Sequence, residues 1–174
     1  MTQTRRRWLL VLALIAGLLA LDLVSKQAAL DNMLEGETIR PISALVPYFQ
    51  ITLSYNSGAA FGIFPQASNV FLVIAVIVVI GMLFFYPSIP DAGDPTRLAV
   101  GMVIAGALGN AIDRLQHGYV VDFIHYRLPA LDISNVSNIA DHLIVFGVLI
   151  MFYDSWRLEK LEEAQQDEQA SDPD

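Results

Sequence analysis

The sequence contains no cysteine among its 174 residues. This absence excludes disulfide bonds, thiol nucleophiles and thiolate metal sites, so any nucleophile must be a hydroxyl, an amine, a carboxylate or an activated water. Charge is also scarce, because Asp, Glu, Lys and Arg make up 16% of the chain, against roughly 25% in soluble proteins. Hydrophobic residues make up 55%, and the mean hydropathy is +0.50. These values argue against an ordinary soluble domain.

The acidic residues that are present concentrate at the C-terminus. Residues 159–174 contain seven carboxylates and one lysine, which account for −6 of the formal net charge of −8. No apolar period continues beyond Leu161. We therefore expect a membrane domain over residues 1–158 and an acidic, disordered cytoplasmic tail over residues 159–174. Solubilisation explains this tail more simply than binding to a partner, and we expect no nucleic-acid partner.

Four apolar segments approach the length of about 20 residues that crosses a bilayer. They cover residues 8–30, 69–86, 98–115 and 139–156. The sequence therefore predicts an α-helical integral membrane protein with four transmembrane helices.

The first segment follows a basic start and has two interpretations. It is similar to a secretory signal, but its length and the Asp22 and Lys26 near its end favour a retained helix. The arginines at residues 5–7 then place the N-terminus in the cytoplasm. Four crossings return the C-terminus to the same side, so the two longer loops, residues 31–68 and 116–137, lie on the outer side.

The third segment carries a stripe of small residues. Gly101, Ala105 and Gly109 follow one another at a spacing of four, which places them on one helix face. In a membrane such a stripe allows another helix to approach closely. We expect a compact helix bundle.

Ionisable residues within or at the ends of membrane spans are costly and usually have a partner or a function. Asp22 and Lys26 are four residues apart, so we expect an ion pair that pins the end of the first helix. The third segment ends in GNAIDR, where Asn110 lies at helical-neighbour spacing from Asp113 and Arg114. These groups fit either a hydrogen-bonded helix end or a set that holds catalytic carboxylates in place.

Two carboxylates flank the second outer loop. Asp122 lies in the apolar run VVDFI, which is either a short buried strand or an interfacial loop. Asn138 is a candidate cap of the fourth helix, with Asp141 three residues later reaching back to it. If the two carboxylates come close in an apolar setting, they share a proton. The charged member can then activate water while the neutral member donates to the developing oxyanion, as in aspartic peptidases.

Alternatives remain open on these residues. His125 and His142 lie near the two carboxylates in sequence and suggest a metal site, but adjacent side chains diverge on a helix, and we expect no metal. Intramembrane carboxylates also relay protons in transporters. A transporter predicts polar residues across the bilayer depth, whereas the second segment has no charge. A non-catalytic scaffold predicts that the carboxylates are dispensable.

The first outer loop contains FQITLSYNSGAAFG. Residues 49–55 are typical of a strand, and the small residues that follow allow close backbone approach. This stretch suggests either an extended edge that pairs with a peptide or a surface hairpin that lies on the membrane.

Five segments together, in this order, resemble the lipoprotein signal peptidases (signal peptidase II), which are bacterial membrane aspartic peptidases. The segments are DLVSK at residues 22–26, NSGAAFG at 56–62, GNAIDR at 109–114, VVDFI at 120–124 and NIAD at 138–141. The resemblance implies a four-helix enzyme of the bacterial inner membrane with a small outer-face β platform. Such enzymes remove signal peptides from prolipoproteins, cutting before a cysteine that carries diacylglycerol.

The resemblance also implies residue roles. Asp122 and Asp141 would be the catalytic pair, and Asp22 and Lys26 a structural pair. The residues implied to bind substrate or order the site are Asn56, Gly58, Asn110, Asp113, Arg114, Asn138 and Ala140.

One position departs from the family pattern. The family usually has an aromatic residue before the Asn of NxAD, and here that residue is Ser137. We expect altered packing beside Asp141 but the same chemistry. The resemblance implies no metal and no cofactor. We expect a monomer whose partners are prolipoprotein substrates and membrane lipid.

Overall fold

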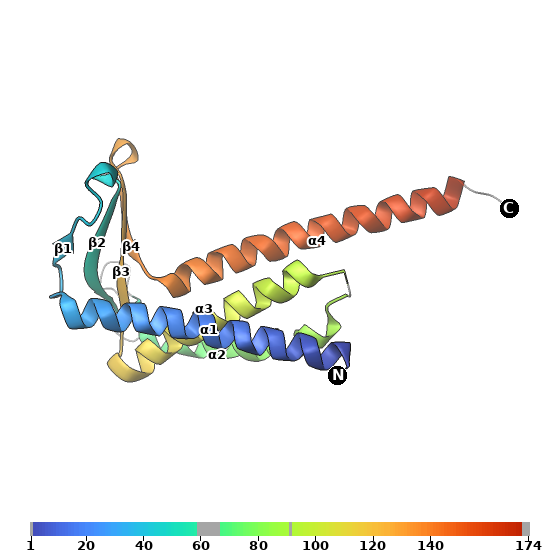
Figure 1. Cartoon of the computed structure of the whole chain (residues 1–174), viewed down its shortest axis with the longest axis horizontal. Coiled ribbons are helices and arrows are strands. Elements are labelled where there is room, and N and C mark those ends of the chain that lie inside the picture. The colour runs from blue at the N-terminus through green and yellow to red at the C-terminus, as the bar shows by residue number, and fades with distance from the viewer. Residues whose placement is uncertain (1, 59–66, 91, 172–174) are drawn as a thin grey trace.

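The computed structural model describes residues 2–58, 67–90 and 92–171. Long helices form a bundle, and a small sheet stands across one end of it (Figure 1). The helices are α1 (Gln3–Asn32), α2 (Ala67–Phe85), α3 (Asp94–His117) and α4 (Ile139–Ser171). In the described part of the chain, these four helical regions are long and apolar enough to cross a membrane. The predicted fold class is confirmed.

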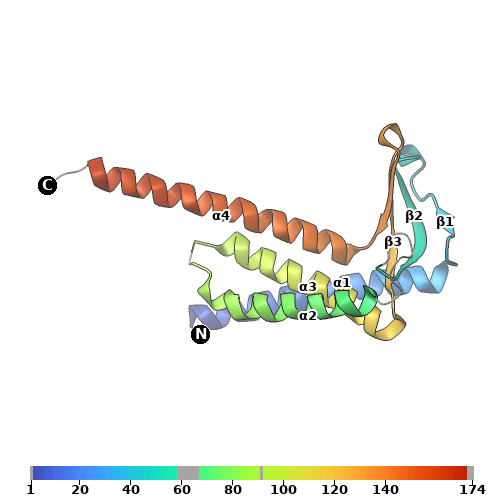
Figure 2. The same ribbon diagram turned by 180° about the vertical axis from the view of Figure 1, so that it is seen from behind.

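α4 continues well beyond the predicted span. Disorder was expected from Glu159 onwards, but residues 159–171 extend α4 as a helix, and Figure 2 shows this end projecting past the rest of the bundle. Glu, Gln, Ala, Lys and Leu are strong helix formers, and an existing helix removes the cost of nucleation. Lys160 also pairs with Glu163 at 2.6 Å. The prediction of disorder, which was based on composition, is therefore wrong for residues 159–171. Residues 172–174 lie outside the described residues.

α3 is the central helix, because it packs against α1, α2 and α4. Its stripe of small residues faces α1. A Cβ added at Gly101 would lie 2.8 Å from Leu14, and one at Gly109 would meet Asp22. The predicted close approach of a second helix is confirmed.

Apolar side chains hold the middle of the bundle together. In lipid this packing works through van der Waals contact, because the surrounding acyl chains are as apolar as the side chains. The cluster comprises Val11, Ile15, Tyr86, Val100, Ile104, Ala105 and Leu143.

The sheet has the strand order β1-β2-β3-β4 with antiparallel neighbours. Its strands are β1 (Thr38–Ile39), β2 (Phe49–Asn56), β3 (Val120–Leu128) and β4 (Ile133–Ser137). The predicted strand is β2, but it lies inside the sheet, so the edges are β1 and β4.

The connections to the helices place the sheet against the bundle. β3 begins shortly after the end of α3, and β4 leads directly into α4. The register pairs Ser54 of β2 with Asp122 of β3. Asp122 is thereby held beside the first turn of α4.

Candidate active site

Asp122 is the third residue of β3 and is 2% exposed. The buried strand, not the interfacial loop, is therefore the correct alternative. Asn138 Nδ2 donates to Asp122 Oδ1 at 2.6 Å, and Asn56 Nδ2 donates to Asp122 Oδ2 at 2.9 Å. Both carboxylate oxygens are held by neutral amides.

Burial raises the pKa of Asp122 to about 6. The hydrogen bond from Asn56 opposes this increase because it stabilises the charged form, and the bond from Asn138 acts in the same direction. The negative charge of Asp141 raises the pKa further. A carboxyl group with this pKa can hold or release a proton near neutral pH.

Asp141 is the third residue of α4. Its backbone N–H donates to Asn138 Oδ1 at 2.9 Å, so Asn138 caps the helix as predicted. The hydrogen-bond partner of the Asp141 carboxylate differs from the predicted one. The carboxylate accepts from Asn110 Nδ2 of α3 at 2.8 Å, and this bond between helices takes the place of the expected reach back to the cap.

Two amide side chains connect the carboxylates. Asn138 Nδ2 contacts Asp122 Oδ1 and also lies 3.2 Å from Asn110 Oδ1. Asn110 in turn donates to Asp141. The fold thus joins Asp122 and Asp141, which are 19 positions apart in the sequence, in one hydrogen-bonded chain.

A buried cation lies next to this chain. Lys26 Nζ is 2.8 Å from both Asp22 Oδ2 and Asp113 Oδ2, and it donates to Asn110 Oδ1 at 3.0 Å. The ion pair expected between Asp22 and Lys26 is present. It is deeply buried, since Asp22 is 0% and Lys26 2% exposed, which a self-paired helix end would not require.

The two carboxylates around Lys26 also tie the chain segments together. Asp22 Oδ1 accepts from the N–H of Ala140, at 2.9 Å, and this links α1 to the first turn of α4. Asp113 Oδ2 accepts from the N–H of Val121, at 3.0 Å, and this links α3 to β3. The backbone on one side of each candidate catalytic residue is therefore anchored to the same ion cluster.

Asn56 is oriented by its own turn. Its Oδ1 accepts from the N–H of Gly58 at 2.9 Å, which leaves Nδ2 to donate to Asp122. Gly58 has a φ of +81°, in the left-handed region that favours glycine. Residues 59–62, the rest of the predicted NSGAAFG segment, lie outside the described residues.

A cavity of about 620 Å³ opens beside this network. This size suits a substantial ligand, and apolar residues of α2 form much of the wall. The polar lining residues are Asn56, Asn110, Arg114, Asn135 and Asp141, and the others include Gly58, Phe71, Ile74, Ala75, Val78, Val103, Ala107 and Ile144.

The cavity also includes Phe71 and Asn135, which the sequence did not single out, beside Arg114, which it did. Arg114 Nη1 donates to the Asn110 carbonyl at 3.2 Å, and its guanidinium carbon lies 5.3 Å from the Phe71 ring centre. Nothing in the apolar run of α2 distinguished Phe71 from its neighbours. The sequence offered a weak indication of Asn135. It lies two residues before Ser137, so the two side chains are on the same face of the strand.

The two histidines near the carboxylates make other contacts. The His125 ring bonds to the hydroxyls of Thr52 and Ser134 at 2.8 and 2.9 Å. The His142 ring bonds to the Asn138 carbonyl and, at 2.6 Å, to the Tyr126 hydroxyl. Both nitrogens of each ring are thus engaged with other groups. Within residues 2–58, 67–90 and 92–171, no group of three or more His, Cys, Asp and Glu is arranged to hold a metal.

Ser137, which departs from the family pattern, is 7% exposed. Its hydroxyl donates to the carbonyl of Ile124 at 3.4 Å, and the two residues are register partners. The serine therefore joins β4 to β3 two residues after Asp122.

Residues 14–157 match the model of the signal peptidase II family, peptidase family A8. The chain belongs to this family. It is 40% identical over 149 residues to the lipoprotein signal peptidase of Moorella thermoacetica, a match that covers 86% of this chain and 91% of the relative. It is 36% identical over 152 residues to that of Halothermothrix orenii, covering 87% and 99%.

Solved structures agree with this membership. One bacterial membrane enzyme, determined by the in meso method at 2.3 Å resolution, has a TM-score of 0.72 and 30% identity, covering 84% of this chain and 87% of its own. Another, at 1.9 Å, has a TM-score of 0.71 and 31% identity, covering 82% and 90%. This signal peptidase II family member is therefore a multi-pass membrane peptidase, as the five sequence segments predicted.

Proposed function

We propose that this peptidase is an aspartic endopeptidase in which Asp122 and Asp141 form the catalytic pair. The observation that carries the proposal is the chain of amides that joins a buried carboxyl group of raised pKa to a second carboxylate at the cavity wall.

The two carboxyl groups would divide the chemistry. Asp141 lines the cavity and takes a proton from the attacking water. Asp122 holds the proton that it donates to the developing oxyanion of the scissile carbonyl. Asn110 positions Asp141, while Asn56 and Asn138 position Asp122. The proton on Asp141 then passes to the leaving amine, and a hydroxyl of the tetrahedral intermediate returns its proton to Asp122 as the product carbonyl forms, which restores the pair.

The proposed substrate is a prolipoprotein whose signal peptide is cut just before a diacylglyceryl-modified cysteine. The names of the relatives support the lipoprotein class. The apolar α2 side of the cavity suits a lipid-modified, apolar peptide that stays in the bilayer. Cleavage at the membrane surface would leave the acyl chains and the signal helix in the membrane.

Purified protein and a diacylglyceryl-modified precursor test the catalytic pair. We expect Asp122→Asn and Asp141→Asn each to lower the cleavage rate by at least about 10³-fold, because each removes one member of an acid–base pair. Asp154→Asn is the control, since Asp154 is as deeply buried as Asp122 but lies in a later turn of α4. Full activity in either pair variant would overturn the assignment, and equal cleavage of the unlipidated precursor would overturn the substrate class.

We also propose that both termini are cytoplasmic and that the sheet lies on the outer side of the bacterial inner membrane. The arginines at residues 5–7 support this orientation. Because the chain lacks cysteine, single cysteines can be labelled without background. In intact spheroplasts, an impermeant maleimide should label Glu35→Cys, and should label Thr4→Cys only after permeabilisation. The reverse pattern would invert the topology.

A further inference from the structure

Two side chains connect the strand and the helix that carry the proposed catalytic pair. His142 directly follows Asp141 in the first turn of α4. Tyr126 lies four residues after Asp122 on β3. The His142 ring bonds through Nε2 to the Tyr126 hydroxyl at 2.6 Å, and through Nδ1 to the carbonyl of Asn138 at 2.5 Å. One imidazole therefore bridges β3 and the start of α4.

The hydrogen bonds of this bridge have a fixed direction in the neutral ring. A carbonyl oxygen can only accept, so Nδ1 of His142 carries the ring hydrogen and donates it to Asn138. Nε2 of the neutral ring then has a lone pair and accepts from the Tyr126 hydroxyl. Burial raises the pKa of Tyr126, so its hydroxyl keeps the proton that it donates. Each group of the bridge thus donates to the next, from Tyr126 to His142 to Asn138.

The two rings of the bridge are packed on both sides. The ring centres of Tyr126 and His142 lie 5.5 Å apart in an edge-on arrangement, with an interplanar angle of 68°. Phe49 of β2 lies 6.4 Å from Tyr126, and Phe146, one turn further along α4, lies 6.4 Å from His142. Edge-to-face contacts favour a defined ring orientation. The packing therefore holds both rings where their hydrogen bond can form.

The bridge ends on the residue that orients Asp122. Asn138 donates from Nδ2 to Asp122 Oδ1, and its Oδ1 accepts from the N–H of Asp141. His142 holds the main chain of the same asparagine through its carbonyl. A shift of the Asn138 main chain would therefore move the donor to Asp122 and the cap of α4 together.

The bridge complements the ion cluster around Lys26. That cluster holds the residues immediately before the proposed catalytic pair, Val121 and Ala140, through their N–H groups. The bridge holds the same two elements after the pair, through Tyr126 on β3 and His142 on α4. Each carboxylate is thus fixed from both directions along its own element.

We propose that His142 and Tyr126 are positioning residues, which set the separation and orientation of the proposed catalytic pair. This inference rests on the proposed function. The described residues that line the cavity include neither side chain, so the bridge acts on the carboxylates and not on bound substrate. Loss of the bridge should therefore lower kcat and leave KM nearly unchanged, because the reacting groups are misplaced beside an intact cavity wall.

Cleavage kinetics of the full chain on a diacylglyceryl-modified precursor test the proposal, with the folded fraction taken from thermal unfolding in the same micelles. Tyr126→Phe removes one hydroxyl and keeps the ring that packs against His142. We expect kcat per folded molecule to fall about tenfold and KM to change by less than about twofold, since a small displacement of reacting groups slows the chemical step. Ser134→Ala is the matched control. Its hydroxyl bonds to the ring of His125, which joins strands only to one another, so kcat and KM should both be kept.

Variants of His142 test whether the two residues act through their bond. His142→Gln keeps an amide that can accept from the Tyr126 hydroxyl, whereas His142→Ala keeps no hydrogen-bonding group. We expect a smaller loss of kcat in His142→Gln than in His142→Ala. The difference should vanish when each is combined with Tyr126→Phe, because both changes then remove the same bond.

Several results would overturn the positioning role. An equal loss of kcat in Ser134→Ala and Tyr126→Phe would show a general loosening of the sheet. A higher KM at unchanged kcat in Tyr126→Phe would show contact with the substrate. A difference between the two His142 variants that persists without the Tyr126 hydroxyl would show that the bond is irrelevant. Full activity of Asp122→Asn or Asp141→Asn would instead overturn the proposed function. Inactive aspartate variants beside a fully active Tyr126→Phe would overturn the positioning role alone.

Discussion

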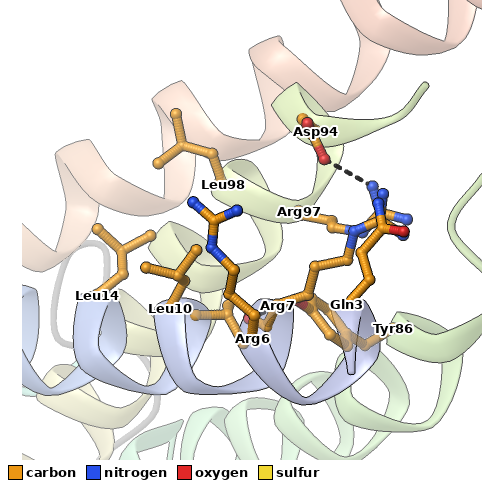
Figure 3. Close-up of a pocket in the computed structure, with 10 residues that line it drawn as sticks. Gln3, Arg6, Arg7, Leu10, Leu14, Tyr86, Asp94, Arg97 and Leu98 are labelled. Atoms are coloured by element: carbon orange, nitrogen blue, oxygen red, sulfur yellow. Dashed lines mark hydrogen bonds and ion pairs between the residues drawn. The ribbon is translucent and has the colours of Figure 1, made fainter. Parts of the chain in front are cut away.

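The two ends of the helix bundle handle charge in opposite ways. At the sheet end, Lys26 and its partners Asp22 and Asp113 are withdrawn from solvent, and Lys26 lies 2.8 Å from each carboxylate. At the N-terminal end, Arg97 pairs with the exposed Asp94 (Figure 3), and the buried Asp154 pairs with Arg157, which is 36% exposed. A cluster that is buried throughout can tune a proton transfer, whereas an ion pair with an exposed member remains partly solvated.

Two buried aspartates show the contrast most directly. Asp154, 0% exposed, accepts from the backbone and hydroxyl of Thr96 and pairs with Arg157 at 2.6 Å. Among the described residues, the side chains that donate to Asp122, which is 2% exposed, are both neutral amides, and the negative charge of Asp141 raises its pKa. The salt-bridged carboxylate joins α4 to α3, whereas burial raises the pKa of the carboxyl group held by amides to about 6.

The region between the two ends argues against a proton-relay transporter. Arg97 and Asn110 of α3 are 13 residues apart, about 20 Å along the helix at ~1.5 Å per residue. The α3 residues that pack the core within this interval, such as Val100 and Ile104, are apolar. A proton path across the bilayer would need polar groups there.

The largest expected effect on stability comes from removing one cation at each end. Lys26→Met leaves Asp22 and Asp113 buried without their counter-ion, and we expect a loss of about 3–5 kcal/mol in the free energy of unfolding. Arg97→Met leaves Asp94, whose side chain is 78% exposed and remains solvated, so we expect a loss of about 1–3 kcal/mol from the unpaired carbonyls. Unfolding in mixed detergent micelles measures both. Equal losses would remove the distinction between the two ends.

A smaller effect separates helix capping from catalysis at Asn138. Asn138→Ser keeps an oxygen that can accept from the N–H of Asp141 but removes the donor to Asp122. We expect unfolding to change by about 1 kcal/mol or less, because serine is a good cap. We expect cleavage to fall by about 10²-fold, because Asp122 is no longer held in position. A variant with normal cleavage would show that this hydrogen bond is dispensable. Asn138→Ala, which lacks both groups, should lose stability as well.

The smallest effect is a displaced pH profile. If Asp122 must carry a proton, cleavage by the unmodified enzyme should decline as the pH rises through about 6. Asn56→Ala removes a donor that stabilises the charged form, so the pKa of Asp122 rises and the decline moves to higher pH. Asn135→Ala, at the wall of the same cavity, serves as the control. A downward shift, or no shift, in Asn56→Ala would contradict the role of Asp122 as the proton donor.

Local features of the sequence predicted the elements well. The apolar runs predicted the four helices, the four-residue spacing predicted the pair of Asp22 and Lys26, and the position of Asn138 predicted a helix cap. The prediction of disorder failed at residues 159–171, because net charge was weighed without helix propensity. The reach of Asp141 back to its cap also failed, since a partner on another helix, Asn110, was not visible in a local pattern.

The sequence by itself determined which segments enter the membrane, because hydropathy and helical period act over neighbouring residues. It also carried the five segments by which the family could be predicted. Only the tertiary structure decided what the polar residues do. Lys26 meets Asn110 across 84 positions, and Asp22 meets Ala140 across 118. Such contacts exist only once the helices have packed, and the same packing removes the water that would otherwise make Asp122 an ordinary carboxylate.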